Sequence, residues 1–249
     1  MRLVLVVRSQ SRCSPKLTCA QTFSVAFYGN KLFQSSFLLA LTGAETTLFQ
    51  FSLAASLNSA VALLGYFGAA ALLDLPAVGR FRLQMTGFFL TGLLYVGCSI
   101  FYKDLSPAIL VSMYLGSSFF GQLGPNATTF IIPAEIFPTE VRTMCHGIAA
   151  ASGKVGALVA AILFNHIKEM DMFLLSGLTS FLACAITLWT IPETNGLDLY
   201  ETDRKWRLIL SGRKQDYHGA ADSPQFLSYH ERSKLNRTEA IIQAKTASL

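Results

Sequence analysis

The sequence contains few charged residues. Asp, Glu, Lys and Arg make up 14% of its 249 residues, whereas 52% are hydrophobic and the mean hydropathy is +0.43. Because soluble domains carry about 25% charged residues, this composition predicts an integral membrane protein. The net charge of +5 would suit a nucleic-acid partner, but the basic residues lie mostly at the ends of apolar runs and in the tail, as topology signals do. We therefore expect no nucleic-acid binding.

Motifs for metal binding and catalysis are also missing. No pair among the five cysteines shows the spacing of metal ligands. No nucleophile, base and orienting residue fall together in a recognisable spacing. The apolar segment at residues 3–7 is shorter than a signal-peptide core of about 7 to 15 residues. We expect no disulfide framework, no metal or other cofactor, no enzymatic activity and no signal peptide.

Long apolar runs dominate the chain instead. Six of them reach about the 20 residues that a transmembrane helix needs, and none has a carboxylate deep inside it. They cover residues 17–44, 46–73, 83–102, 105–134, 143–165 and 172–191. The predicted fold class is all-α integral membrane, a bundle of six transmembrane helices.

These runs divide the chain into three parts. Residues 1–16 form an N-terminal segment and residues 17–192 the six-helix bundle, while residues 193–249 form a tail that we expect to be largely disordered. In this tail, residues 197–210 fit an amphipathic helix with Trp206 at a membrane surface.

The basic residues predict the orientation. If the N-terminus is cytoplasmic, Lys103 and Lys168 are the only basic residues on the outer side. This positive-inside bias, followed by six spans, places both termini in the cytoplasm. We expect a multi-pass protein of the plasma membrane.

Polar residues in the first run recur at helical spacing. Gln21, Ser24, Tyr28, Lys31 and Ser35 are separated by three or four residues and form one stripe on an apolar cylinder. The stripe either faces a cavity or makes polar contacts between packed helices, and periodicity favours neither.

The fourth run is interrupted at Gly124, Pro125 and Asn126. Pro125 removes a backbone donor, which membrane helices tolerate where neighbours re-satisfy the backbone. Gln122, Asn126 and Thr129 share one face at this break. Because discontinuous helices with polar residues mark the binding sites of transporters, we predict a substrate site here.

Lys154 lies near the middle of the fifth run, on the same side as His146 and Ala150. An ionisable residue at membrane depth costs about 2.5 to 3.5 kcal/mol even on the lowest scale, so it usually marks a pathway or binding site. Lys154 pairs with a carboxylate, snorkels to the interface or meets an anionic substrate. The lack of a deep carboxylate favours the anionic substrate.

Several segments resemble one known family. The run GPNATTFIIPAEIFPTEVRTMCHGIAAASGK is similar to the segment that joins the tenth and eleventh helices of proton-coupled phosphate symporters in the major facilitator superfamily. VAFYGNKLFQ resembles their seventh helix, GRFRLQMTGFF the start of the ninth and IPETNG the exit of the twelfth. The resemblance covers residues 25–199. It implies the C-terminal half of a transporter, helices seven to twelve, which carries inorganic phosphate with protons by alternating access.

The resemblance also implies roles for individual residues. Tyr28 and Asn126 would hydrogen-bond phosphate oxygens beside Lys154. Gln122 and Thr129 are added to the predicted substrate site because they share the face of Asn126. Phenol and amide donors with an ammonium suit a tetrahedral oxyanion. A second set resembles the charged residues of the cytoplasmic gate: Asp74, Arg80, Glu135, Arg142 and Glu193.

Three departures from the family pattern stand out. Ala20 and Ser24 replace a usual Trp and Asp, so a carboxylate expected in proton coupling or phosphate binding is missing. The loop between Asp74 and Arg80 is longer than the family's, which weakens the case for that gate contact. Six of twelve helices are present, which implies a partial gene model or a natural half-transporter. Its partner would be the N-terminal six-helix half or another transporter chain.

Two other functions remain open. Because gate charges are shared across the superfamily, the chain is alternatively half of a sugar or organic-ion porter. In a different class, it is a non-transporting membrane protein that associates with intact transporters through small residues such as Gly65 and Ala69 on its helix faces.

Overall fold

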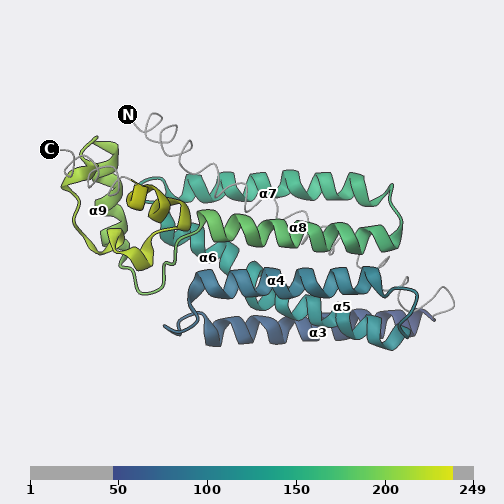
Figure 1. Ribbon diagram of the computed structural model, residues 1–249. Helices are drawn as coiled ribbons and strands as arrows, with labels where there is room; N and C mark the ends of the chain where they lie inside the picture. Colours follow the sequence, from purple (N-terminus) through teal and green to yellow (C-terminus); the bar gives the residue numbers. More distant parts are fainter. Residues whose placement is uncertain (1–46, 238–249) are drawn as a thin grey trace.

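The computed structural model describes residues 47–237, and within them the regular elements are all helices (Figure 1). The main helices, in chain order, are α3 (Leu48–Leu72), α4 (Gly79–Ile100), α5 (Pro107–Gly121), the π-helical turn η1 (Gln122–Asn126), α6 (Ala127–Ile136), α7 (Arg142–Phe164), α8 (Glu169–Thr190) and α9 (Leu199–Leu210). The first expected helix, at residues 17–44, lies outside the described residues, and so does Tyr28.

The helices have the length and composition of membrane spans. α3, α4, α7 and the Met170–Thr190 part of α8 are each long and apolar enough to cross a membrane. The expected run at residues 105–134 differs, because it is divided into α5, η1 and α6 around Pro125. The all-helical membrane class is confirmed, while the total of six spans stays a prediction.

Small residues bring α3 and α4 close to the interrupted helix. A Cβ on Gly87 of α4 would lie 2.9 Å from Gly124 Cα, and one on Gly65 of α3 would lie 2.5 Å from Phe119 O. Ala69 is buried one turn after Gly65. The face expected at Gly65 and Ala69 is therefore a helix contact, and the close approach fixes η1 between two neighbouring helices.

A buried aromatic cluster joins α4, α5 and α8. The ring centroid of Phe173 lies 6.3 Å from that of Tyr95 and 6.5 Å from that of Tyr114, and the Tyr114 pair is edge-on. Such pairs add to the apolar area that the rings bury. The cluster holds the three helices in a fixed relation, with α4 between α8 and α5 (Figure 1).

Apolar side chains remain exposed along the outer faces of α3 and α7. Exposed apolar surface of this extent requires lipid or another helix as its neighbour. The exposed residues include Leu53, Leu57, Leu64, Phe67, Val155, Leu158 and Ile162.

The C-terminal segment, residues 199–237, lies at one end of the bundle (Figure 1). After α9 come the 3-10 turns Lys214–Asp216, Ala220–Asp222 and Pro224–Phe226, and residues 229–237 are helical. The buried Tyr217 donates its hydroxyl to the Glu201 carboxylate at 2.6 Å, and Lys205 Nζ lies 2.8 Å from Asp222. These contacts order a segment for which we expected disorder.

α9 confirms the expected amphipathic helix but places Trp206 differently. The indole Nε1 of Trp206 donates to the carbonyl of Ile136 at 3.0 Å. Its ring packs against the cluster of Phe137, Val141 and Cys145. Trp206 is therefore turned toward the bundle and anchors α9 to the connection between α6 and α7, while its place at a membrane surface stays a prediction.

Candidate functional site

The predicted helix break is a π-helical turn. Pro125, inside η1, cannot donate a backbone hydrogen bond. The hydroxyl of Thr128 donates to the Gly124 carbonyl at 2.9 Å, which satisfies an acceptor at the irregular turn. π-Helical turns inside α-helices are frequent at functional sites, and this one turns Gln122 and Asn126 into the bundle.

Three side chains form a polar cluster at this turn, namely Tyr66, Gln122 and Asn126. Asn126 Nδ2 donates to Gln122 Oε1 at 2.5 Å and also to the hydroxyl of Tyr66. Asn126 and Gln122 are each only 5% exposed. The break therefore gathers two amides and a phenol in apolar surroundings, where hydrogen bonds are stronger than in water.

Tyr66 is a member of this cluster that the sequence did not reveal. It lies on α3, 60 residues from Asn126, and nothing in its local pattern links it to the break. The sequence feature that could have identified it is the neighbouring Gly65. Because Gly65 has no side chain, α3 approaches η1 closely enough for the Tyr66 hydroxyl to reach Asn126.

The other predicted substrate residues are not all brought together. Thr129 follows on α6, and its Oγ1 is buried without a hydrogen-bond partner among residues 47–237. Lys154 is exposed near the middle of α7. Its place in the same site as Asn126 stays a prediction, as does that of Tyr28.

Four of the five predicted gate residues meet around Arg80, in what we term the Arg80 cluster. Arg80 Nη2 lies 3.1 Å from both Asp74 Oδ1 and Glu135 Oε1, and its Nη1 donates to the Leu73 carbonyl at 3.1 Å. The side chains of Arg80 and Glu135 are 13% and 22% exposed. Asp74 and Arg80 are therefore in contact despite the long loop between them, because Asp74 folds back onto the guanidinium, while the gate role of the pair stays a prediction.

Glu193 belongs to the same cluster, but its carboxylate binds backbone N–H groups and not the Arg80 guanidinium. Its carboxylate accepts from the backbone N–H groups of Arg80 at 3.0 Å and Phe81 at 3.3 Å. These are unpaired donors of the first turn of α4, whose own N-cap Val78 offers no side-chain bond. Glu193 thus caps α4 from the end of α8, where the positive end of the helix dipole favours an anion.

Gly79 makes room for this cap, and its replacement is expected to be costly. Gly79 has φ +67°, and a Cβ there would lie 2.6 Å from Glu193 Cδ. Gly79→Ala should lower the free energy of unfolding by about 1 to 3 kcal/mol through backbone strain alone and displace the cap as well. Thermal unfolding of the purified protein measures the loss. Gly196→Ala is the matched control, because Gly196 also has a positive φ, +80°, but no atom lies within 4 Å of the added Cβ. Equal losses of stability in the two variants would show that displacement of the Glu193 cap adds nothing to the backbone strain.

Arg142 does not join the Arg80 cluster. Its Nε donates to the Phe137 carbonyl at 3.1 Å, and its Nη2 lies 4.0 Å from Asp203 Oδ1. Asp203 also accepts from the backbone N–H of Thr139 at 2.8 Å and from its hydroxyl at 2.5 Å. The predicted gate residues therefore form two clusters, and the second includes α9.

Two further residues of the Arg80 cluster lie in the segment after α8. Thr194 donates its hydroxyl to Glu135, and Asn195 accepts from Arg80 Nη1 through its side-chain oxygen. Both belong to the sequence IPETNG, which resembles the exit of the family's twelfth helix and in which Glu193 was the residue predicted for the gate. Their position directly after Glu193 in the sequence could have identified them.

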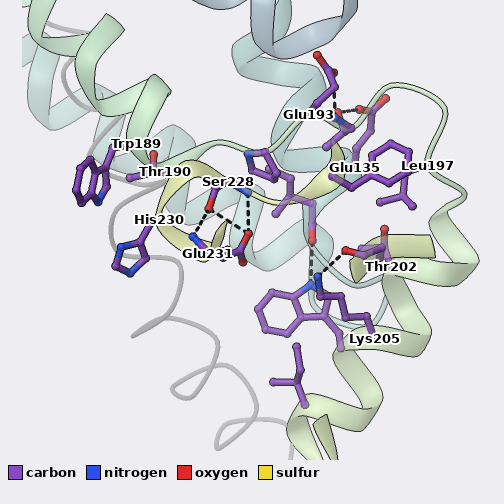
Figure 2. A pocket seen from close by; sticks show the side chains of 17 residues that line it. Glu135, Trp189, Thr190, Glu193, Leu197, Thr202, Lys205, Ser228, His230 and Glu231 are labelled. Atoms are coloured by element: carbon purple, nitrogen blue, oxygen red, sulfur yellow. Dashed lines mark hydrogen bonds between the residues drawn. The ribbon is translucent and has the colours of Figure 1, made fainter. Parts of the chain in front are cut away.

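A cavity of ≈ 330 Å³ lies between the Arg80 cluster and the C-terminal segment (Figure 2). Its carboxylates are engaged, because Glu135 is paired with Arg80, Glu193 caps α4 and Glu231 accepts from Ser228 at 3.0 Å. The ammonium of Lys205 is paired with Asp222. The cavity therefore suits an anion poorly, and its apolar walls come from Ile136, Trp189, Pro192, Leu197, Trp206, Ile209 and Phe226.

Comparison with known proteins places these features in a family. The profile of the family described as "Sugar (and other) transporter" matches residues 20–206. Inorganic phosphate transporter 1-11 of Oryza sativa subsp. japonica is 36% identical over 198 residues, which cover 71% of this chain and 35% of the rice protein.

Other relatives give the same result. Inorganic phosphate transporter 1-4 of Arabidopsis thaliana is 32% identical over 222 residues, covering 77% of this chain and 40% of that protein. Low affinity inorganic phosphate transporter 1 of Petunia hybrida is 34% identical over 212 residues, which cover 73% of this chain and 39% of that protein. The chain thus spans well under half the length of these relatives.

Proposed function

Because the chain belongs to the sugar (and other) transporter family, within the major facilitator superfamily, we propose that it forms part of an inorganic phosphate transporter. The part in question corresponds to the superfamily's helices seven to twelve, a six-helix half. The polar cluster at the π-helical turn carries this proposal, because it combines a buried amide donor with a helix break in a chain whose relatives are named phosphate transporters.

In this proposal, phosphate binds at the Asn126 side of the bundle. Amide N–H groups that now donate to neutral oxygens would donate to phosphate oxygens, and hydrogen bonds to a charged group are about twice as strong. Thr129 adds a hydroxyl whose oxygen is buried and unpaired in the described part of the chain. Lys154 and Tyr28 complete the site with an ammonium and a phenol.

Alternating access follows from the way α6 joins the two regions. The ten residues of α6 run from the π-helical turn to Glu135 and Ile136. Glu135 is tied to Arg80 of α4, and the Ile136 carbonyl to Trp206 of α9. A displacement of the turn on phosphate binding would therefore be carried along about 15 Å of helix, at 1.5 Å per residue, to the Arg80 cluster.

From the positive-inside bias we propose that the Arg80 cluster and α9 lie on the cytoplasmic side, and we propose the plasma membrane as the location. Opening of this side would require the ion pairs of Arg80 and Arg142 to separate. The proposed transport is symport with protons. Transporter sites of this kind lie between repeats, so a second set of helices must complete the phosphate site. The N-terminal six-helix half or another transporter chain would supply these helices.

Competition for uptake tests the substrate. The full-length protein that contains this chain, reconstituted in vesicles, is expected to accumulate radiolabelled phosphate, and excess arsenate should suppress the uptake while hexoses should not. Arsenate is a tetrahedral oxyanion like phosphate, so it engages the same amide and ammonium donors.

A sugar porter is the second candidate, because the matching family profile is described by sugar transport. Accumulation of labelled hexose that is insensitive to phosphate would establish this alternative and exclude phosphate. Absence of uptake for both, together with co-purification with an intact transporter, would instead indicate a non-transporting subunit.

A further inference from the structure

His146 has an unusual place on α7. It lies one turn after Arg142 and is partly buried against α6, where its ring centroid is 6.2 Å from that of Phe130. Its Nδ1 is buried and finds no hydrogen-bond partner among residues 47–237. A buried ring nitrogen without a partner normally calls for a functional explanation.

His146 is also the histidine that lies within a helix long enough to span a membrane, as the fifth residue of α7. The chain has four histidines. His166 follows α7, and His218 and His230 lie in the C-terminal segment, so none of these is inside a helix long enough to span a membrane. Histidine is the side chain that ordinarily changes charge between pH 5 and 8.

Among the four described helices that could span a membrane, the Met170–Thr190 span contains one carboxylate, Asp171, in the first turn of α8 and thus next to the far end of α7 from His146. On α6, the element packed against this part of α7, the ionisable residue is Glu135, and it lies in the last turn, engaged by Arg80 and Thr194. On α7 itself, the charged residues are Arg142, one turn before His146, and Lys154, about 12 Å further along at 1.5 Å per residue.

The cationic neighbours and the unpaired Nδ1 have a common consequence. Arg142, whose Nη2 lies 4.0 Å from Asp203 Oδ1, is one turn before His146, and Nδ1 of His146 has no hydrogen-bond partner among residues 47–237. A bound phosphate would bring negative charge onto the same side of α7. Opposite charges attract most strongly in a low-dielectric site, so phosphate and a proton on His146 would favour each other's binding reciprocally.

We propose that His146 carries the proton of the symport. This inference rests on the proposed phosphate transport. In the step, Nδ1 accepts a proton from the outer solution while phosphate is bound near Asn126. It releases the same proton toward the Arg142 end of α7 after phosphate has left. One proton enters and one leaves, so the imidazole is unchanged over the cycle.

The test separates proton coupling from phosphate binding. The full-length protein is reconstituted in vesicles whose membrane potential is held at zero. Phosphate counterflow is measured at equal pH, and net accumulation is measured with the outside one pH unit more acidic. One coupled proton then supplies about 1.4 kcal/mol, or roughly tenfold accumulation. We expect His146→Gln to keep counterflow and to lose the accumulation.

The outcomes are distinguishable. His166→Gln is the control, because it makes the same substitution at a histidine that lies after α7. This variant should accumulate phosphate like the unmodified protein. Full accumulation by His146→Gln would overturn the inference. Loss of counterflow in His146→Gln would also overturn it, because it would assign the residue to phosphate binding or folding. Absence of counterflow in the unmodified protein would refute the proposed function, and this inference with it.

Discussion

Replacement of Asn126 by Ala is expected to reduce phosphate uptake by the complete transporter about ten- to hundredfold. The substitution removes a donor to the charged substrate, which is worth about 1.5 to 3 kcal/mol, and each 1.4 kcal/mol is about tenfold in affinity. It also leaves Gln122 Oε1 and the Tyr66 hydroxyl without the donor that they share. Radiolabelled phosphate uptake over a range of concentrations should show the loss mainly in KM.

Asn58→Ala is the matched control for this experiment. Asn58 is also a buried amide, with 2% of its surface exposed. It precedes Tyr66 on α3 by about 12 Å at 1.5 Å per residue, and we expect near-normal uptake. Tyr66→Phe, which removes one acceptor and keeps the ring, should have an intermediate effect. Undiminished uptake by Asn126→Ala would place the phosphate site elsewhere, and equal losses in Asn126→Ala and Asn58→Ala would indicate general destabilisation.

Arg80→Gln is expected to lower the stability of the protein substantially. Glu135 is mostly buried and its counter-charge is Arg80, so the substitution leaves a carboxylate desolvated and unpaired. Loss of a charged hydrogen-bond partner of this kind costs about 1 to 3 kcal/mol. For a chain of this size, the midpoint of thermal unfolding should fall by roughly 2 to 12 °C, which differential scanning fluorimetry of the detergent-solubilised protein measures.

Neighbouring variants show whether burial causes this effect. Asp74 is 82% exposed, and exposed ion pairs contribute about 0 to 1 kcal/mol, so Asp74→Asn should shift the midpoint only slightly. Arg82→Gln removes an arginine that donates to the Ala77 carbonyl and should also be mild. The double variant of Arg80→Gln and Glu135→Gln should recover part of the loss. If Arg80→Gln unfolds at the same temperature as Arg82→Gln, the cluster is not a stabilising contact.

The break at Gly124, Pro125 and Asn126 illustrates what a sequence reveals well. Pro125 cannot complete a regular hydrogen-bond ladder wherever the helix packs, so the irregular turn follows from local chemistry. The lengths of the apolar runs are similarly local, because the thickness of a bilayer sets them. The helices α3, α4, α7 and α8 accordingly lie close to the runs from which they were predicted.

The tail shows the opposite case. Its polar composition suggested disorder, yet Tyr217 and Trp206 find partners in Glu201 and Ile136. Average composition does not reflect so few contacts between individual residues.

The sequence by itself determined that this protein is a helical membrane protein, that one helix is broken beside Asn126, and which charged residues lie at helix ends. Only the tertiary structure decided the partners: Tyr66 for Asn126, Asp203 for Arg142, and the first turn of α4 for Glu193. These partners are separated along the chain, by 60 residues for the Tyr66 pair and 113 for the Glu193 cap. Periodicity records which face of a helix a residue occupies, whereas pairing depends on distances between helices, which close packing at Gly65 and Gly87 sets.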